Sequence, residues 1–158
     1  MIRPFAPEDT DAIIGIAVDT NMFAEEDTGI LRDMLSNHPT VDHGDNSKII
    51  ILEEDGEVIG VAYYEPAPAT DRAWYLTMIA VHPEKQADGR GTLLMQNVED
   101  ALIAAGQRML LVNTSGTPDY DRTRSFYLRC GYEQVAHIRD YWSAGDDLIV
   151  FCKILHAS

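Results

Sequence analysis

The sequence predicts a mixed α/β fold, with a central sheet of about seven strands and four helices. Two observations carry this prediction. Two apolar runs, "KIIILEE" and "EVIGVAYYEP", flank Asp55-Gly56, which is a strong short-range signal for an antiparallel hairpin. The apolar run "RAWYLTMIAV" is followed by an amphipathic helical pattern and then by "RMLLVN", as expected for a parallel βαβ crossover. Antiparallel and parallel pairing in one chain indicates a mixed sheet.

Before the hairpin we expect one strand and two helices. "MIRPF" reads as a short strand, and "APEDTDAIIGIAVDTN" as a helix with acidic residues in its first turn and apolar residues at helical spacing. A second helix is expected from about Glu25 to Leu35, carrying Ile30, Met34 and Leu35. "NHPTVDHGDN" then forms a polar loop.

After the hairpin, "RAWYLTMIAV" is apolar enough to be a strand buried on both faces. The next helix begins near Gly91 and ends at Gly106. Its apolar stripe consists of Leu94, Met95, Val98, Ala101, Leu102 and Ala105. "DYDRTRSFYLRCGY" forms a fourth helix that Gly131 stops, and "EQVAHIRDYW" and "DDLIVFCKIL" form a closing strand pair around "SAGD". The order is βααβββαβαββ, and no linker interrupts it, so residues 1–158 are expected to form a single domain.

Composition excludes several classes of partner. The 158 residues include 12 Lys+Arg against 26 Asp+Glu, a net charge of -14, which disfavours nucleic acid and favours a cationic substrate. "MIRPFAPEDTD" has no apolar signal core, and no stretch approaches the roughly 18 apolar residues that span a bilayer, so we expect no membrane partner and a cytoplasmic protein. Cys130 and Cys152 match no metal-ligand spacing and are expected to be small buried hydrophobes.

Metal binding is not expected elsewhere either. His38 and His43, with Asp42 and Asp45, lie in a polar loop, and their spacing matches no recognised set of metal ligands.

The segment "QADGRGTLL" joins the buried strand to the amphipathic helix and contains two glycines, Gly89 and Gly91. It lacks the third glycine of the dinucleotide fingerprint and the Gly-Lys-Ser/Thr of the nucleotide P-loop. The remaining pattern, Gln86-x-x-Gly89-x-Gly91, permits positive φ and close approach of a ligand, with backbone N–H groups directed at an anion. A tight turn without a ligand would explain the same two glycines.

Two segments resemble the GNAT superfamily of N-acetyltransferases, and the resemblance covers nearly the whole chain. "YLTMIAVHPEKQADGRGTLLM" is similar to the family's fourth strand and its Q/R-x-x-G-x-G/A acetyl-CoA loop, and "TRSFYLRCGY" to its closing helix motif. The resemblance implies that acetyl-CoA is the cofactor and that its pantetheine arm pairs with backbone near Ile79 and Val81. It places the pyrophosphate on the amides of Gln86, Ala87, Asp88, Gly89, Arg90, Gly91 and Thr92. Asn113 would hydrogen-bond the cofactor or simply cap its strand.

The same resemblance suggests catalytic residues. Tyr127 falls where many members have the tyrosine that acts as general acid toward the thiolate, although a packed aromatic is the alternative. The glutamate that histone-type members use as a base is absent, because Tyr75 occupies its position. Tyr75, Glu65 and Tyr141 are candidate replacements, and each has a structural explanation as well.

The acceptor site is the least defined part of the sequence. The tail "RDYWSAGDDLIVFCKIL" is similar to the D-Y-aromatic-x-x-G-D-D tail of one branch of the superfamily and, more loosely, to the hairpin of peptide amino-terminal acetyltransferases, where it lines the acceptor groove. A polar turn beside an aromatic pair is the alternative. Phe23, Glu25 and Glu26 would contact the acceptor from the early region, although an acidic helix start explains the glutamates equally well.

We therefore expect an acetyl-CoA-dependent N-acetyltransferase that works by direct attack of an amine, because no Cys-His or Ser-His arrangement indicates a covalent intermediate. The acceptor would be a small-molecule amine or a peptide amino terminus. A non-catalytic acyl-CoA-binding module and a nucleotide-binding α/β domain are the alternatives. Many relatives of this size pair through their closing strands, so a homodimer is a further expectation.

Overall fold

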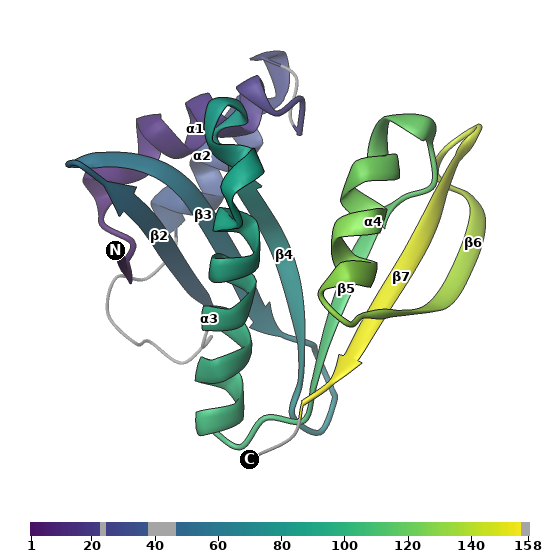
Figure 1. Cartoon of the computed structure of the whole chain (residues 1–158). Coiled ribbons are helices and arrows are strands. Elements are labelled where there is room, and N and C mark those ends of the chain that lie inside the picture. The colour runs from purple at the N-terminus through teal and green to yellow at the C-terminus, as the bar shows by residue number, and fades with distance from the viewer. Residues whose placement is uncertain (23–24, 38–46, 156–158) are drawn as a thin grey trace. The chain divides into compact units, whose positions relative to one another are not determined.

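The computed structural model describes residues 1–22, 25–37 and 47–155. Its helices and strands are β1 (Ile2–Pro4), α1 (Thr10–Asp19), α2 (Thr28–Asn37), β2 (Lys48–Glu54), β3 (Glu57–Pro66), β4 (Ala73–Val81), α3 (Arg90–Ala104), β5 (Met109–Ser115), α4 (Asp121–Arg129), β6 (Glu133–Ser143) and β7 (Asp146–Ile154) (Figure 1). The strands hydrogen-bond in the order β1-β2-β3-β4-β5-β7-β6. The predicted mixed α/β fold and its order of helices and strands are confirmed.

The chain forms two compact units. The first contains Met1–Glu65 and Met78–Val98, and the second contains Pro66–Thr77 and Glu99–Ser158. The polar loop expected at "NHPTVDHGDN" lies almost entirely outside the described residues.

The hairpin of the first unit follows the sequence signal. β2 pairs antiparallel with β3 from Lys48 opposite Tyr64 to Glu54 opposite Glu57. The two connecting residues have positive φ, 52° at Asp55 and 78° at Gly56, as a type I′ turn requires. This turn matches the right-handed twist of the strands and sets the pairing next to it. An irregularity between Leu52 and Glu53 then shifts the register of the rest of the hairpin.

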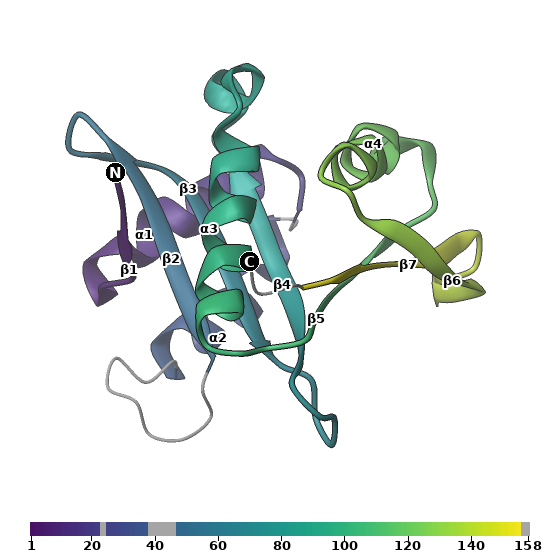
Figure 2. The same ribbon diagram turned by 60° about the horizontal axis from the view of Figure 1, so that its bottom comes forward.

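Helices cover both faces of the sheet in the first unit. Figures 1 and 2 show α1 and α2 on one face and the first half of α3 on the other. The core on the α1 and α2 side consists of Ile13, Ile14, Ile16, Ala17, Leu31, Leu35, Ile49, Ile51, Val61, Tyr63, Met78 and Ala80. On the α3 side, Leu94 packs against Gly60 so closely that a Cβ at that glycine would lie 3.0 Å from Leu94 Cδ1.

The second unit contains the parallel crossover. The first half of β4 pairs parallel with β5, from Ala73 opposite Met109 to Leu76 opposite Val112. β5 pairs antiparallel with β7, and β7 with β6, which is the edge strand. The βαβ unit and the closing strand pair are therefore confirmed.

Three details of the expected helices and strands are corrected. Ile30 of α2 is 62% exposed, because Leu31 and Leu35 instead form the stripe that faces the core. Ala101 of α3 and Ala105, which directly follows the helix, are exposed, whereas Glu99 is buried beside the apolar stripe. β4 is not buried on both faces, since Thr77 is exposed. Tyr75 and Ile79, two residues before and two residues after Thr77, are only half-buried.

The two thiols and the helix lengths complete the description. Cys130 and Cys152 are free and half-buried rather than fully buried as expected. None of the described helices is long and apolar enough to cross a membrane.

Candidate functional site

The turn between β4 and α3 is built around one glycine rather than two. A 3-10 turn, Pro83–Asp88, ends at Gly89, which is left-handed with φ 78° and ψ 13°. The carbonyl of Gly89 accepts the N–H of Leu93 at 3.0 Å, so Gly89 is the N-cap of α3. Gly91 lies inside the first helical turn and is not among the residues with positive φ. Only Gly89 therefore uses the conformational freedom that both glycines were expected to provide.

Side chains and backbone hold this turn against the sheet of the first unit. The side-chain amide of Gln86 donates to the carbonyl of Val81 at 3.0 Å, across the turn. The N–H of His82 donates to the carbonyl of Ile59 on β3 at 2.7 Å. Gln86 thus has a structural task of its own, which is to tie the turn to the end of β4.

Arg90 braces the turn from the other side. Its guanidinium forms two hydrogen bonds to Glu54 of β2, Nε to Oε2 at 2.5 Å and Nη2 to Oε1 at 2.9 Å. It also donates to Asp88 at 3.0 Å and to the Lys85 carbonyl at 3.2 Å. The hydrogen bonds from Arg90 hold the pKa of the Glu54 carboxyl below its usual range. The positive charge of Arg90 is thus already engaged by two carboxylates.

The start of α3 has the features of an anion-binding site. With Gly89 as N-cap, the N–H groups of Gly89, Arg90, Gly91 and Thr92 have no acceptor within α3. The helix has 15 residues, so its positive dipole end lies at these amides. A Cβ built on Gly89 meets nothing within 4 Å, so the space beside it is open. Backbone amides can therefore hold an anion here despite the overall negative charge.

The remaining residues expected at the cofactor loop also lie in the first unit. Ile79 is half-buried and Val81 is buried on β4. Ala87 and Asp88 belong to the 3-10 turn, and the side chain of Asp88 is 76% exposed where it pairs with Arg90. The expected cofactor-loop residues, from Ile79 to Thr92, are thus contiguous in the first unit.

Tyr127 lies in the second unit, on α4, and is 5% exposed. Its ring contacts those of Phe126, Tyr132 and Phe151, with centroid distances of 5.5, 6.1 and 5.6 Å. Burial raises the pKa of Tyr127 above its usual range, so the phenol keeps its proton at neutral pH. The packed-aromatic interpretation is correct as far as the ring is concerned, and it leaves a protonated hydroxyl that can donate a hydrogen bond.

The end of β5 combines an exposed amide with buried hydroxyls. Asn113 is exposed and pairs with Val150 of β7. Ser115, two residues on, is buried; its Oγ donates to Asp146 at 2.5 Å and accepts the N–H of Thr117 at 3.1 Å. The strand-end cap that was the alternative for this segment is thus formed by Ser115, and Asn113 is left exposed.

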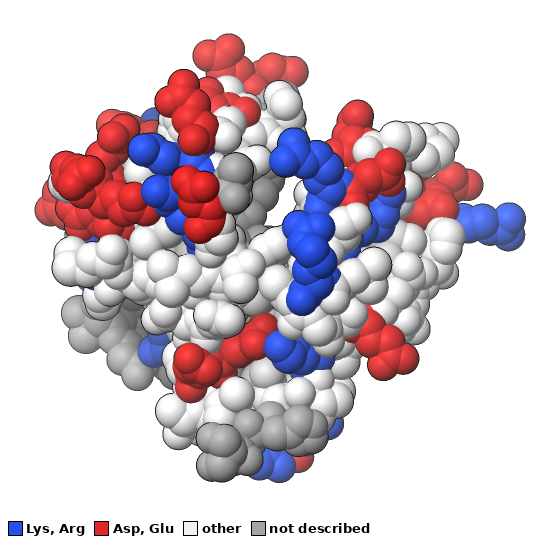
Figure 3. Space-filling model, in the orientation of Figure 1, with Lys and Arg blue, Asp and Glu red and all other residues white. Residues whose placement is uncertain are grey.

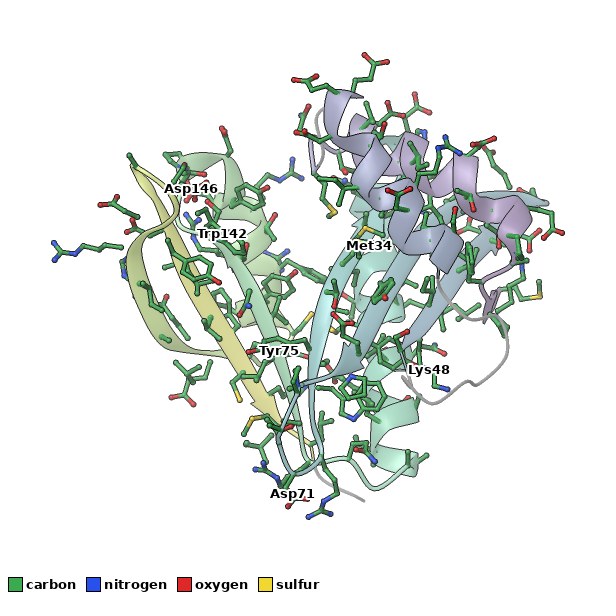
Figure 4. The ribbon with its side chains drawn as sticks, turned by 180° about the vertical axis from the view of Figure 1, so that it is seen from behind. Met34, Lys48, Asp71, Tyr75, Trp142 and Asp146 are labelled. Atoms are coloured by element: carbon green, nitrogen blue, oxygen red, sulfur yellow. The ribbon has the colours of Figure 1, made fainter. Side chains whose placement is uncertain are left out.

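Aromatic and acidic residues of the closing hairpin gather near its turn, where Figure 4 shows Trp142 and Asp146. The Tyr141 and Trp142 rings meet edge to face at 4.9 Å and are 54% and 48% exposed as residues. Asp147 accepts the N–H of Asp140 at 3.0 Å and contacts His137 Nε2 at 2.6 Å, and these partners lower the pKa of Asp147. These carboxylates stabilise the hairpin itself, while the two aromatic rings remain accessible.

The candidate bases are distributed over both units. Glu65 lies at the end of β3 in the first unit, and Tyr75 lies on β4 in the second; both are half-buried. Tyr141 also belongs to the second unit. Glu25 and Glu26 form an exposed 3-10 turn, whereas Phe23 lies outside the described residues.

The histidine and aspartate residues that were considered as metal ligands, His38, Asp42, His43 and Asp45, are also outside the described residues. Within the described ranges, no three His, Cys, Asp or Glu side chains are grouped so as to hold a metal ion.

Charge is unevenly distributed over the surface. Figure 3 shows Lys and Arg side chains gathered along α4, in a protein whose net charge is -14. The arginines of this helix are Arg122, Arg124 and Arg129. Arg124 donates to the carbonyls of Ser115 and Thr117, at 2.6 and 2.9 Å, and so anchors α4 to the end of β5. α4 is therefore a locally basic element of the second unit.

Three contributors to this arrangement could not be found from the sequence. Glu54, the partner of Arg90, is 36 residues away in sequence. Glu99 and Lys153 form a partly buried ion pair, with Lys153 Nζ 2.9 Å from Glu99 Oε1, and lie 54 residues apart in sequence. The one available signal was the position of Glu99 directly after Val98 in the apolar stripe of α3.

Comparison with known proteins adds independent findings. An amino-acid acetyltransferase from Azotobacter vinelandii is 36% identical over 76 residues, which are 48% of this chain and 17% of that protein. A Desulfovibrio desulfuricans protein assigned to the GNAT family of acetyltransferases superposes with a TM-score of 0.90 at 29% identity, covering 99% of both chains. An aminoglycoside 6'-N-acetyltransferase complexed with coenzyme A shares the fold, with a TM-score of 0.79 at 16% identity over 99% of this chain and 97% of that one.

This chain spans less than a fifth of the length of the curated relatives that it matches. The family model for the acetyltransferase (GNAT) domain matches residues 45–134, which is more than half of the chain. That stretch contains the hairpin, β4, the Gly89 turn, α3 and α4. The chain therefore belongs to the GNAT family of acetyltransferases.

Proposed function

We propose that the protein transfers an acetyl group from acetyl-CoA to a primary amine, by direct attack and without a covalent enzyme intermediate. The observation that carries this proposal is the start of α3, where Gly89 caps the helix directly after β4 and the first backbone N–H groups of the helix have no acceptor within it. Family membership supports the interpretation of that anion site as a seat for coenzyme A.

Each group of residues has a defined task in this proposal. The amides from Gln86 to Thr92 bind the diphosphate, and the backbone near Ile79 and Val81 aligns the pantetheine arm. The Arg90–Glu54 pair and the Gln86–Val81 hydrogen bond keep the turn in its binding shape before the ligand arrives. Acetyl-CoA, when bound, supplies the activated thioester that a neutral amine attacks.

Tyr127 assists departure of the thiolate. A thiol has a pKa near 8.5 and an unperturbed phenol one near 10, so full proton transfer from tyrosine is uphill by about 2 kcal/mol. Burial raises the pKa of Tyr127 further and makes full transfer still less favourable. Tyr127 is therefore proposed to stabilise the departing sulfur by donating a hydrogen bond while keeping most of its proton.

The acceptor is proposed to be an amine that is easily deprotonated. An amine with a pKa near 10.4 costs about 4.6 kcal/mol to deprotonate at pH 7, whereas an α-amino group near 7.8 costs about 1 kcal/mol. Tyr75 replaces the carboxylate base, so a weak base such as Tyr75, Glu65 or Tyr141, or a chain of waters, must be sufficient. The partial match to an amino-acid acetyltransferase supports an α-amino acceptor, free or at a peptide terminus.

The alternative is a non-catalytic acyl-CoA-binding module, which the missing glutamate favours. A thiol-release assay with acetyl-CoA and a panel of amino acids, short peptides, polyamines and aminoglycosides separates the two proposals. Release of CoA with at least one amine is expected of the enzyme. Binding of acetyl-CoA with no release on any amine would favour the module.

The role of Tyr127 has a direct test. Tyr127→Phe is expected to lower kcat by about a hundredfold, the lower range for loss of an acid catalyst, while the Kd of acetyl-CoA measured by calorimetry changes little. Tyr64→Phe, which removes another buried tyrosine hydroxyl on β3, is the matched control and should retain turnover. Wild-type turnover in Tyr127→Phe would disprove the acid role.

Three coarser expectations remain part of the proposal. Residues 1–158 are proposed to act as one catalytic domain. Two free thiols are consistent with a reducing compartment such as the cytoplasm. A homodimer is proposed to form through β6, an 11-residue edge strand on which Val135, Ile138, Tyr141 and Trp142 are each about half exposed.

A further inference from the structure

A largely buried polar cluster, made up of residues with no task assigned so far, lies in the second unit. Glu99 of α3 accepts two hydrogen bonds, from the Tyr132 hydroxyl to Oε2 and from Lys153 Nζ to Oε1, both at 2.9 Å. Lys153 Nζ also donates to the Cys130 carbonyl at 2.9 Å and lies 5.6 Å from the centre of the Tyr132 ring. The Glu99 side chain is only 11% exposed. Both of its carboxylate oxygens are thus engaged by different donors.

Stability alone explains this cluster poorly. Removing the Glu99 carboxylate from water is costly, and replacing a largely buried ion pair by apolar residues of similar volume is often neutral or stabilising. The Glu99 carboxylate instead orients its neighbours, because its two oxygens hold the Tyr132 hydroxyl and Lys153 Nζ at the same time. The Tyr132 hydroxyl therefore has a defined position relative to α3 and β7.

Tyr132 in turn is in direct contact with Tyr127. The backbone N–H of Tyr132 donates to the carbonyl of Tyr127 at 3.0 Å, and the two rings lie 6.1 Å apart at an interplanar angle of 59°. Phe151 supports the Tyr127 ring as well, at 5.6 Å. Since the Tyr127 ring is packed between these neighbours, a shift of Tyr132 changes where the Tyr127 hydroxyl is held.

Gly131 allows the chain to turn sharply at the end of α4, beside Lys153. Its φ is +90°, and a Cβ at this position would lie 3.6 Å from Lys153 Nζ. The chain leaves α4 in this left-handed turn and brings Tyr132 back under the helix, while Lys153 binds the Cys130 carbonyl at the helix end. One lysine therefore contacts both the end of the helix that carries Tyr127 and the carboxylate that fixes Tyr132.

We propose that Glu99 is a positioning residue that acts through Tyr132 to hold the hydroxyl of Tyr127 in place for acetyl transfer. This inference rests on the proposed function and deepens it. Glu99 and Tyr132 need not touch the substrate or the cofactor. They keep the side chain of Tyr127 in position, so that its hydroxyl can stabilise the departing sulfur.

Two substitutions test the proposal with little loss of volume. Tyr132→Phe keeps the ring and removes the hydroxyl. Glu99→Gln keeps the shape but leaves one acceptor oxygen where two donors compete, so that either Tyr132 or Lys153 loses its partner. Each is expected to lower kcat by about tenfold, within the loss that a misplacement of 1 Å or less produces, with the KM for acetyl-CoA unchanged.

A double-mutant cycle distinguishes positioning from a general structural effect. In a Tyr127→Phe background, Tyr132→Phe and Glu99→Gln should lower kcat no further, because the group they position is already gone. Glu57→Gln, on the exposed start of β3, is the control and should leave kcat unchanged in both backgrounds. Thermal unfolding of each variant confirms that the protein assayed is folded.

The outcomes separate the two levels of the proposal. Full turnover of Tyr132→Phe and Glu99→Gln, or an equal loss in the Tyr127→Phe background, would overturn the positioning role while leaving the acid role of Tyr127 intact. Full turnover of Tyr127→Phe alone would instead disprove the acid role, and the positioning role with it.

Discussion

Gly89→Ala tests the turn on which the proposed cofactor site depends. Gly89 has φ 78° and ψ 13°, and a Cβ built there meets nothing within 4 Å, so the substitution introduces no clash. Its effect comes from the backbone, where a left-handed conformation costs an L-residue about 1 to 2 kcal/mol. Alanine also restricts the unfolded chain, which stabilises the folded protein by about 0.4 to 1 kcal/mol, so the net decrease in unfolding free energy is about 1 kcal/mol.

Gly15→Ala is the matched control. Gly15 lies in the middle of α1, its φ is not positive, and a Cβ there also meets nothing within 4 Å. Alanine is a better helix former than glycine, so this variant is expected to gain about 0.5 to 1 kcal/mol. The two glycine-to-alanine substitutions, both in open space, should therefore change the unfolding free energy in opposite directions, because the two glycines differ in φ.

Urea denaturation measures the two stabilities, and calorimetric titration measures the affinity for acetyl-CoA. If the turn relaxes in Gly89→Ala instead of remaining strained, the loss is expected in affinity, and about 1 kcal/mol corresponds to a roughly fivefold higher Kd. Wild-type stability together with wild-type affinity in Gly89→Ala would refute the reasoning about both the conformation of this turn and its role.

Two further predictions concern acid stability and assembly. Hydrogen bonds from Arg3, at 2.8 and 2.9 Å, and from the Ala6 N–H hold the pKa of the Asp9 carboxyl below its usual value. The contribution of Asp9 to the unfolding free energy is therefore complete above about pH 5 and is lost as pH falls from about 4 through the lower folded pKa. The difference in unfolding free energy between wild type and Asp9→Asn should shrink over that range, and a difference that is constant from pH 6 to pH 2 would contradict this. If two β6 strands pair antiparallel about Ala136, Glu133 of one copy lies opposite Arg139 of the other. Arg139→Glu should then weaken the dimer measured by sedimentation equilibrium, and adding Glu133→Arg should restore it. A wild-type protein that is monomeric at all concentrations would exclude the dimer.

Much of the fold could be read from local signals. Asp55-Gly56 predicted the hairpin because two consecutive residues with positive φ are a local requirement. The stripe of Leu94, Met95, Val98 and Leu102 predicted α3 because a helix repeats every 3.6 residues. The choice between Leu31 and Ile30 in α2 was missed, because the sequence offers two overlapping apolar sets and only packing selects one.

The candidate site, too, was predicted only in part from the sequence. The sequence located the turn at Gly89 and the tyrosine at position 127, and it assigned Gly91 a conformation that the structure does not give it. It did not identify what holds these residues. The base and the acceptor contacts, Tyr75, Glu65, Tyr141 and Phe23, remain predictions, because no pattern of neighbouring residues specifies them.

By itself, the sequence determined the order of helices and strands, the hairpin, the helix stop at Gly131 and the family-specific turn before α3. These features depend on backbone preference and on periodicity over a few residues. Only the tertiary structure decided that Arg90 pairs with Glu54, 36 residues away, and that Glu99 joins Tyr132 and Lys153, 33 and 54 residues away. Such pairs depend on distances between side chains that come together only when the chain has folded, so the residues that hold the site became visible in the structure alone.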